Sequence, residues 1–162
     1  MLVRVAQSAD VETMFDIRTS VKENYQSREE VAELGITPES VAAMLATDCR
    51  GWIAELEEQP MGFAIANANE ANILGMFVLP EFEGRGAGRA LMAAAETWLW
   101  SKGLDEIWLL TGNDPALRAY GFYQHLGWKF TEIVTEGDFA GEAKFIKQRS
   151  PIAAKGLVRT VF

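Results

Sequence analysis

Cysteine and histidine are almost missing from this sequence of 162 residues. Cys49 is the only cysteine, and His125 is the only histidine. A single cysteine allows neither an internal disulfide nor a cluster of cysteine ligands around a metal. We therefore expect no disulfide and no bound metal ion.

Positive charge is also scarce. The sequence has 15 lysines and arginines against 23 aspartates and glutamates, which gives a net charge of −8. General binding to nucleic acid needs a basic surface, so a nucleic-acid partner is not expected. The acidity has two interpretations: it serves solubility alone, or it attracts a cationic ligand such as an amine.

Long apolar runs are absent as well. The longest one falls far short of the ~18 residues that a membrane-spanning helix needs. Residues 1–10 also lack the hydrophobic region of a secretion signal. We therefore expect a cytoplasmic protein with no membrane partner. No shift in composition marks a boundary, so we expect a single domain over residues 1–162.

What is present is a regular succession of strand and helix patterns. Strands are expected at residues 2–5, 52–56, 61–66, 73–79, 107–110, 128–135 and 143–146. Helices are expected from Ser8 or Asp10 to about Asn24, after Thr37-Pro38, from Gly88 to about Lys102, and at 115–126. Residues 25–36 are expected to form a loop or a broken helix. This order predicts an α/β (α+β) fold, with a mixed, mostly antiparallel central sheet of about seven strands and helices on both faces.

The most informative segment is the glycine-rich loop at residues 81–88. It follows the apolar strand that stops at Pro80, and a helical pattern begins directly after it. The N-terminus of a helix offers unpaired N–H groups and a partial positive charge. Glycines allow phosphates to approach the backbone closely, and Arg85 and Arg89 add positive charge. The segment therefore predicts a site for a phosphate-bearing cofactor.

Three interpretations of this loop compete on local pattern alone. A dinucleotide-binding fold needs G-x-G-x-x-G in its first βα turn, whereas Gly84, Gly86 and Gly88 lie in the middle of the chain and Arg89 follows them. A P-loop needs Gly-Lys-Ser/Thr, which is absent. A glycine-rich turn without a ligand is the third interpretation.

Two segments together carry a resemblance to a known family. Residues 78–91, VLPEFEGRGAGRAL, resemble the acetyl-CoA-binding motif of the GCN5-related N-acetyltransferases, whose core is Gln/Arg-x-x-Gly-x-Gly/Ala. Residues 121–128, GFYQHLGW, are similar to that family's Phe-Tyr-x-x-Leu-Gly-Phe segment. The resemblance covers nearly the whole chain. It implies the acyl-CoA N-acyltransferase (GNAT) fold, with acetyl-CoA as the cosubstrate.

The resemblance also assigns residues to the cofactor. Backbone N–H groups of the loop and helix start would bind the CoA pyrophosphate, and a bulged strand end would pair with the pantetheine arm. Gly75 would ease that bulge. An N–H near the end of the strand would polarise the thioester carbonyl. The cofactor residues are Met76, Phe77, Val78, Arg85, Gly86, Ala87, Gly88 and Arg89.

Tyr123 falls on the tyrosine that acts as general acid in the family. Its phenol would protonate the departing CoA thiolate. Spacing alone favours Tyr123 as a core residue of the helix 115–126, whereas the motif favours the general acid. Two positions depart from the family pattern: Glu83 replaces the Gln/Arg, and Ala116 replaces a cofactor-contacting asparagine, for which Asn113 is a possible substitute.

The sequence does not identify a single general base or a single acceptor. Glu55, Glu70 and His125 are candidate bases, and each is also readable as a solvated surface residue. Acceptor specificity in the family comes from the first two helices and their loop. Here residues 23–33 are acidic, which indicates a cationic small-molecule acceptor, with a peptide N-terminus or a lysine as alternatives.

The resemblance thus implies an N-acetyltransferase that passes an acetyl group directly from acetyl-CoA to a primary amine. The ternary complex needs no covalent intermediate, and Cys49 lies far from both motifs. One alternative is a non-catalytic acyl-CoA-binding sensor or adaptor, which would not need Tyr123. Another is transfer of a longer acyl group. A homodimer is possible, and the tail 150–162 is either a swapped strand or a loose end.

Overall fold

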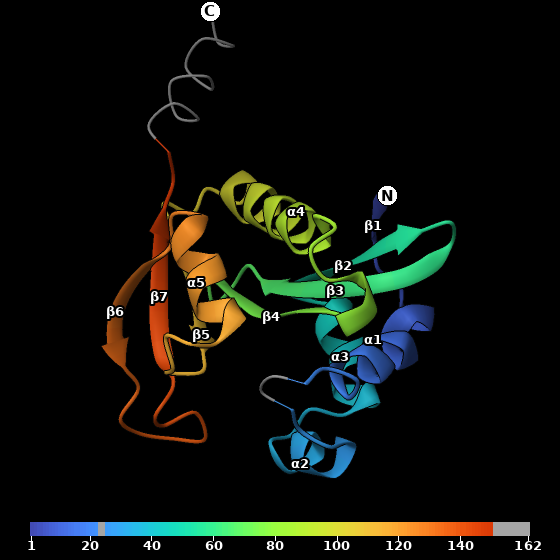
Figure 1. Cartoon of the computed structure of the whole chain (residues 1–162), viewed down its shortest axis with the longest axis horizontal. Helices are drawn as coiled ribbons and strands as arrows, with labels where there is room; N and C mark the ends of the chain where they lie inside the picture. The colour runs from blue at the N-terminus through green and yellow to red at the C-terminus, as the bar shows by residue number, and fades with distance from the viewer. Residues whose placement is uncertain (23–24, 151–162) are drawn as a thin grey trace, which may run out of the picture. The chain divides into compact units, whose positions relative to one another are not determined.

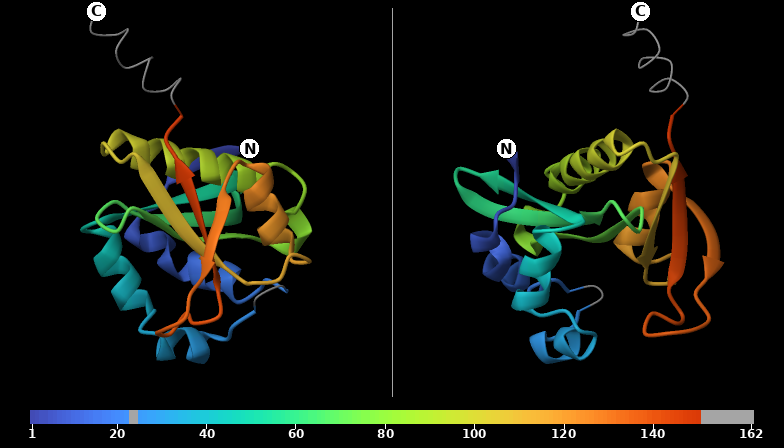
Figure 2. Two further views of the ribbon diagram at one scale, coloured as in Figure 1. Left: turned by 90° about the vertical axis from the view of Figure 1, so that its left-hand side faces the viewer. Right: turned by 180° about the vertical axis from the view of Figure 1, so that it is seen from behind.

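The computed structural model describes residues 1–22 and 25–150. It contains two compact units, Met1–Leu99 and a second one that begins at Trp100 (Figures 1 and 2). The described part has seven strands, four in the first unit and three in the second. Each unit therefore has its own strands and helices, and each places different candidate residues.

The first unit is an antiparallel sheet with helices on both faces. Its strands are β1 (Leu2–Val5), β2 (Cys49–Leu56), β3 (Gln59–Asn67) and β4 (Asn72–Val78), which pair in that order. Its helices are α1 (Val11–Arg18), α2 (Arg28–Glu33), α3 (Pro38–Leu45) and α4 (Ala87–Ser101), with 3-10 turns η1 (Ser8–Asp10) and η2 (Pro80–Phe82). Helices α1 and α3 lie on one face of β2–β4, and α4 lies on the other (Figure 1).

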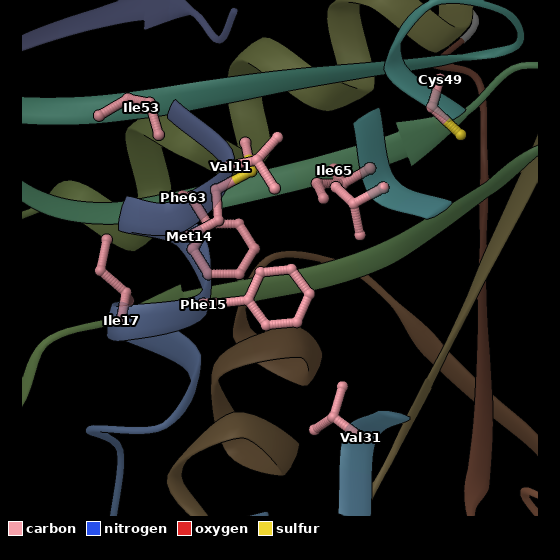
Figure 3. Close-up of a cluster of buried hydrophobic side chains, with 10 residues drawn as sticks. Val11, Met14, Phe15, Ile17, Val31, Cys49, Ile53, Phe63 and Ile65 are labelled. Atoms are coloured by element: carbon pink, nitrogen blue, oxygen red, sulfur yellow. The ribbon is translucent and has the colours of Figure 1, made fainter. Parts of the chain in front are cut away.

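The alternating direction of apolar side chains along β2 explains why helices cover both faces of the sheet. Ile53 is fully buried in the apolar cluster beneath α1, where it lies with Met14 and Phe63 (Figure 3). The preceding residue, Trp52, points to the opposite face and meets the ring of Trp98 of α4 edge-on at 5.7 Å. Successive side chains of a strand point to opposite faces, so a strand that is apolar at consecutive positions must be covered twice.

The second unit is a three-stranded antiparallel sheet with one helix. It contains β5 (Glu106–Thr111), α5 (Arg118–His125), β6 (Lys129–Ile133) and β7 (Ala143–Gln148). Strand β7 pairs with both β5 and β6. Phe145 of β7 is fully buried, and the rings of Tyr120, Tyr123 and Phe130 surround it. The expected final antiparallel pair is confirmed.

The first predicted helix was too long. We expected it to run to about Asn24, which lies outside the described residues, but α1 ends at Arg18. The hydroxyls of Thr19 and Ser20 donate to the carbonyls of Phe15 and Asp16, at 2.8 and 2.6 Å. These side chains bond the last carbonyls of the helix in place of a further helical turn.

The start of the last helix also differs from the prediction. Helix α5 begins at Arg118 rather than at 115, because the Asp114 carboxylate accepts the N–H of Ala116 and its carbonyl accepts that of Leu117. The segment 25–36 contains the short helix α2, which Ser27 and Glu30 start through a reciprocal capping box. Among the described helices, none is both long enough and apolar enough to cross a bilayer.

Candidate cofactor site and the buried tyrosine

The glycine-rich loop connects β4 to α4 within the first unit. Gly84 and Gly86 have φ values of +76° and +86°, a left-handed conformation that favours glycine. A Cβ atom built on either residue would meet no atom within 4 Å. These glycines are therefore required by backbone conformation rather than by crowding, and the surface beside them is open to a ligand.

The start of α4 presents its first N–H groups next to these glycines. The first bond of the helix runs from the Ala90 N–H to the Gly86 carbonyl, at 3.1 Å. The N–H groups of Gly86, Ala87, Gly88 and Arg89 come before this bond and have no place in the helical ladder. With the dipole of a 15-residue helix behind them, these N–H groups have the arrangement that favours an anion at a helix N-terminus.

Arginine side chains flank this helix start. Arg85 and Arg89 are both exposed. The Arg85 guanidinium lies 5.7 Å from the ring centre of Phe82, which is buried beneath the loop. Glu83, the acid at the family's Gln/Arg position, is also exposed. The loop therefore combines two exposed cations with one exposed acid, next to the backbone N–H groups of the helix start.

Strand β4 carries a bulge immediately before the expected cofactor residues. Gly75 pairs with Ile65 and Ile73 with Ala66, so Leu74 has no partner on β3. This is the bulge that Gly75 was expected to ease. It interrupts the ladder just before the segment 76–78, which is half-buried.

Phe77 fixes the middle of that segment through its side chain. Its ring lies 5.6 Å from the ring of Phe63, and the guanidinium carbon of Arg18 lies 4.5 Å from its centre. Arg18 also donates to the Gln26 side chain at 2.7 Å. The contact between Arg18 and Phe77 was missed in the sequence, because the two residues are far apart along the chain. The side chain of Phe77 packs in the core, which leaves its backbone for the expected role.

Tyr123 lies in α5, in the second unit. It is buried, and the rings of Phe122, Trp128 and Phe145 lie 5.5, 6.3 and 6.3 Å from its own. Burial raises the pKa of its phenol to about 12, because the low-dielectric surroundings disfavour the charged phenolate. The hydroxyl is therefore protonated throughout the neutral range, which is the form that a proton donor needs.

This pKa predicts a loss of stability at alkaline pH. The unfolded phenol releases its proton near pH 10, whereas the folded one holds it to about 12. The raised pKa of Tyr123 therefore adds to the free energy of unfolding. This contribution is fully present below pH 10 and disappears as the pH rises from 10 to 12. It amounts to about 2–3 kcal/mol.

Urea unfolding at pH 8 and pH 11.5 measures this effect in wild type and in Tyr123→Phe. The wild type should lose about 2 kcal/mol more than the variant over this range. Burial also raises the pKa of the Cys49 thiol, to about 11, but this residue is present in both proteins and cancels. Equal losses of unfolding free energy in the two proteins would show that the pKa of Tyr123 is not raised by burial.

The candidate bases are in different surroundings. The Glu55 carboxylate forms an ion pair with Arg4, which also pairs with Asp10 and holds the pKa of that carboxyl below its usual range. Glu70 is exposed, and its N–H donates to the Asn67 side chain. His125 is exposed at the end of α5. Glu55 is thus tied into an ion-pair network that links β1, η1 and β2.

The expected cofactor residues fall into one unit. The segment Met76–Val78 and the segment Arg85–Arg89 belong to the first unit and are connected through η2, whereas Tyr123 belongs to the second. Asn113 and Ala116 are exposed residues ahead of α5. Within residues 1–22 and 25–150, no group of three or more His, Cys, Asp or Glu side chains is placed to hold a metal ion.

Comparison with known proteins identifies the family. The chain matches the Acetyltransferase (GNAT) family over residues 11–128, and it belongs to this family. It is 31% identical over 94 residues to an uncharacterized N-acetyltransferase of Methanocaldococcus jannaschii, a match that covers 51% of this chain and 40% of that protein. It is 32% identical over 84 residues to one of Chlorobaculum tepidum, covering 50% of each. The chain thus spans half or less of the length of these curated relatives.

Solved structures confirm the fold class. The structure is similar to that of the PaiA N-acetyltransferase from Thermoplasma acidophilum in complex with coenzyme A, with a TM-score of 0.73 and 21% identity. The match covers 92% of this chain and all of that one (100%). The expected acyl-CoA N-acyltransferase fold, with its seven-stranded mixed sheet, is therefore confirmed.

Proposed function

We propose that this protein is an N-acetyltransferase that passes the acetyl group of acetyl-CoA directly to a primary amine. The observation that carries the proposal is the loop between β4 and α4. Two left-handed glycines there expose the first N–H groups of a 15-residue helix, directly after a bulged strand. Membership of the GNAT family and the coenzyme A complex of a structural neighbour support acetyl-CoA as the ligand.

In the proposed reaction, the helix start binds the pyrophosphate and β4 lies along the pantetheine arm. A backbone N–H of Phe77 or Val78 hydrogen-bonds the thioester carbonyl and stabilises the oxyanion. The amine nitrogen attacks the carbonyl carbon, and the carbon–sulfur bond then breaks. The departing thiolate receives the proton of the Tyr123 phenol, the nitrogen of the new amide releases its extra proton to water, and water returns a proton to the Tyr123 phenolate.

Direct transfer is favoured over an acyl-enzyme by the state of the single cysteine. Cys49 is buried in the core of the first unit, and burial raises the pKa of its thiol to about 11. The thiolate is the nucleophilic form of cysteine, and at neutral pH this thiol is protonated. A ternary complex of protein, acetyl-CoA and amine therefore fits the chain better.

The acceptor is proposed to be a small cationic amine that the acidic segment 23–33 attracts. Glu29, Glu30 and Glu33 are exposed, whereas residues 23 and 24 lie outside the described range. Arg28 pairs with Glu12 and Asp16 of α1, so these three glutamates carry the local negative charge of α2. A peptide or lysine acceptor, a longer acyl donor, a homodimer, a cytoplasmic location and a single domain stay predictions.

Removing the negative charges of α2 tests whether they attract the amine acceptor. Replacing Glu29, Glu30 and Glu33 by Gln should raise the KM of the best amine roughly threefold to tenfold at low salt, with unchanged acetyl-CoA affinity. The effect should shrink at high salt because surface charges are screened. The control changes Glu57, Glu58 and Glu132, which are exposed on other elements, to Gln. Unchanged KM in the α2 variant, or an equal rise in the control, would refute the cationic acceptor.

One observation favours a second function, an acyl-CoA-binding module without catalysis. Tyr123 is surrounded by aromatic rings, as a purely structural core residue would be. The two functions differ in turnover. Release of free CoA thiol is measured with acetyl-CoA and a panel of polyamines, amino acids, aminoglycosides and peptides. Amine-dependent thiol release establishes the transferase, whereas binding without release throughout the panel favours the module.

A further inference from the structure

We propose that a bulge in β3, at Met61 and Gly62, positions the end of β4 for acetyl transfer. The inference rests on the proposed function, because it concerns the strand end assigned to the thioester. Ala54 pairs with Gly62 and Glu55 with Pro60, so Met61 is an extra residue on β3. The bulge lies opposite the last residues of β4, where Gly62 pairs with Val78.

Two contacts connect this bulge to the backbone of β4. The Met61 carbonyl accepts the N–H of Leu79 at 2.8 Å. A Cβ atom on Gly62 would lie 2.6 Å from the Phe77 carbonyl oxygen and 3.1 Å from the Val78 Cα. Both of these neighbours are backbone, so no side chain can rotate away to make room. The absence of a side chain at Gly62 is what allows the two strands to approach so closely.

The side chain of Phe77 holds the same strand end from the helix side. Phe63 and the Arg18 guanidinium contact its ring. Phe77 and Val78 are thus restrained through the ring, through the backbone and through the adjoining Leu79. An oxyanion hydrogen bond requires a donor that is in place before the charge develops. The bulge supplies that restraint on the backbone, and Gly62 is a positioning residue.

The variant Gly62→Ala tests this role. Since real Cβ contacts stay above 3.0 Å, the distance between this Cβ and the Phe77 carbonyl oxygen must widen by at least 0.4 Å, from 2.6 to 3.0 Å, which shifts the two strands relative to each other. Small displacements of a reacting geometry have large effects on rate. We expect kcat to fall at least tenfold, while the Kd for CoA, which lacks the thioester, changes less than threefold. The affinity for CoA should change little because the proposed pyrophosphate site, at the start of α4, is separate from the strand end that Gly62 contacts.

Gly51→Ala is the matched control. Gly51 is a glycine of the neighbouring strand β2, and its added Cβ would meet the side chains of Met14, Ala6 and Leu45, the first at 2.9 Å. This variant crowds the same sheet without touching β4. We expect it to lower the Tm while kcat stays within threefold of wild type. Equal kcat values in Gly51→Ala and Gly62→Ala at temperatures where both are folded would overturn the inference.

A second pair of variants covers the case in which Gly62→Ala does not fold. Leu79 has φ −59° and ψ 139°, which suit proline, so Leu79→Pro removes the N–H that bonds Met61 without demanding a new backbone conformation. Leu79→Ala loses the same side chain and keeps the N–H. We expect a kcat at least fivefold lower in Leu79→Pro than in Leu79→Ala, and equal values would refute the inference. A wild type without any amine-dependent turnover overturns the proposed function instead.

Discussion

Replacing Gly86 with valine will weaken acetyl-CoA binding roughly 100-fold, which is about 3 kcal/mol. Gly86 has φ +86°, a conformation that a β-branched residue avoids at a cost of about 1–2 kcal/mol. Relief of that strain turns the Gly86 and Ala87 N–H groups away from the pyrophosphate. Each lost bond to a charged group adds about 1.5–3 kcal/mol. Isothermal titration of acetyl-CoA into both proteins measures the difference.

A control for strain alone is available at the other end of the same helix. Gly103 has φ +82°, and a Cβ built on it also meets nothing within 4 Å. Gly103→Val therefore imposes comparable strain where no ligand is proposed. It should lower the Tm as Gly86→Val does, and should leave the Kd of acetyl-CoA within twofold. A similar loss of affinity in both variants would show that strain in α4, rather than the loop's own N–H groups, governs binding.

The second large effect is expected from Tyr123→Phe, which should lower kcat by about 10² to 10³-fold. The phenol is protonated at neutral pH because burial raises its pKa to about 12, and phenylalanine has no proton to give to the thiolate. The aromatic neighbours at 5.5 to 6.3 Å still pack against a phenylalanine ring. The Kd of acetyl-CoA should therefore stay within threefold, and the loss should appear in kcat alone.

Tyr120→Phe is the matched control for this change. Tyr120 lies on the same helix, and its ring meets Phe145 edge-on at 4.9 Å. The substitution removes the same atom from the same helix and should leave kcat within threefold. If Tyr123→Phe also keeps kcat within threefold, Tyr123 is a structural residue, and another group or water protonates the thiolate.

Features encoded by consecutive residues were predictable from the sequence. The strand that ends at Pro80, the loop with Gly84 and Gly86, and the following helix form one continuous segment, and the structure confirms each part. The N-cap at Thr37-Pro38 and the helix end at Gly103 are confirmed for the same reason. Local backbone preferences decide such features, so they can be read without knowing the fold.

Helix boundaries decided by side-chain hydrogen bonds were less predictable. Thr19 and Ser20 lie within the span of the first predicted helix, yet their hydroxyls bond the last carbonyls and α1 ends before them. The Asp114 side chain likewise delays the start of α5. Pattern alone does not tell whether such a residue continues a helix or ends it.

Contacts between distant segments were missed. Nothing local to Arg18 indicates that it will stack on Phe77, because pairing of α1 with β4 follows only from the assembled sheet. Gly62 carried a weak signal, since an isolated glycine within a strand often marks a bulge or a close approach of backbones. The extra residue at Met61 became visible only once the registers of β2 and β4 against β3 were known.

Calorimetric titration of acetyl-CoA into the purified protein, with NADH and ATP as control ligands, tests the proposed cofactor site most directly. All three carry phosphates and an adenosine, but only acetyl-CoA has the pantetheine arm that β4 is proposed to pair with. We expect saturable binding of acetyl-CoA, at least tenfold tighter than either control, and loss of most of that affinity in Gly86→Val. Absence of acetyl-CoA binding, or equal affinity for all three ligands, would contradict the proposed site.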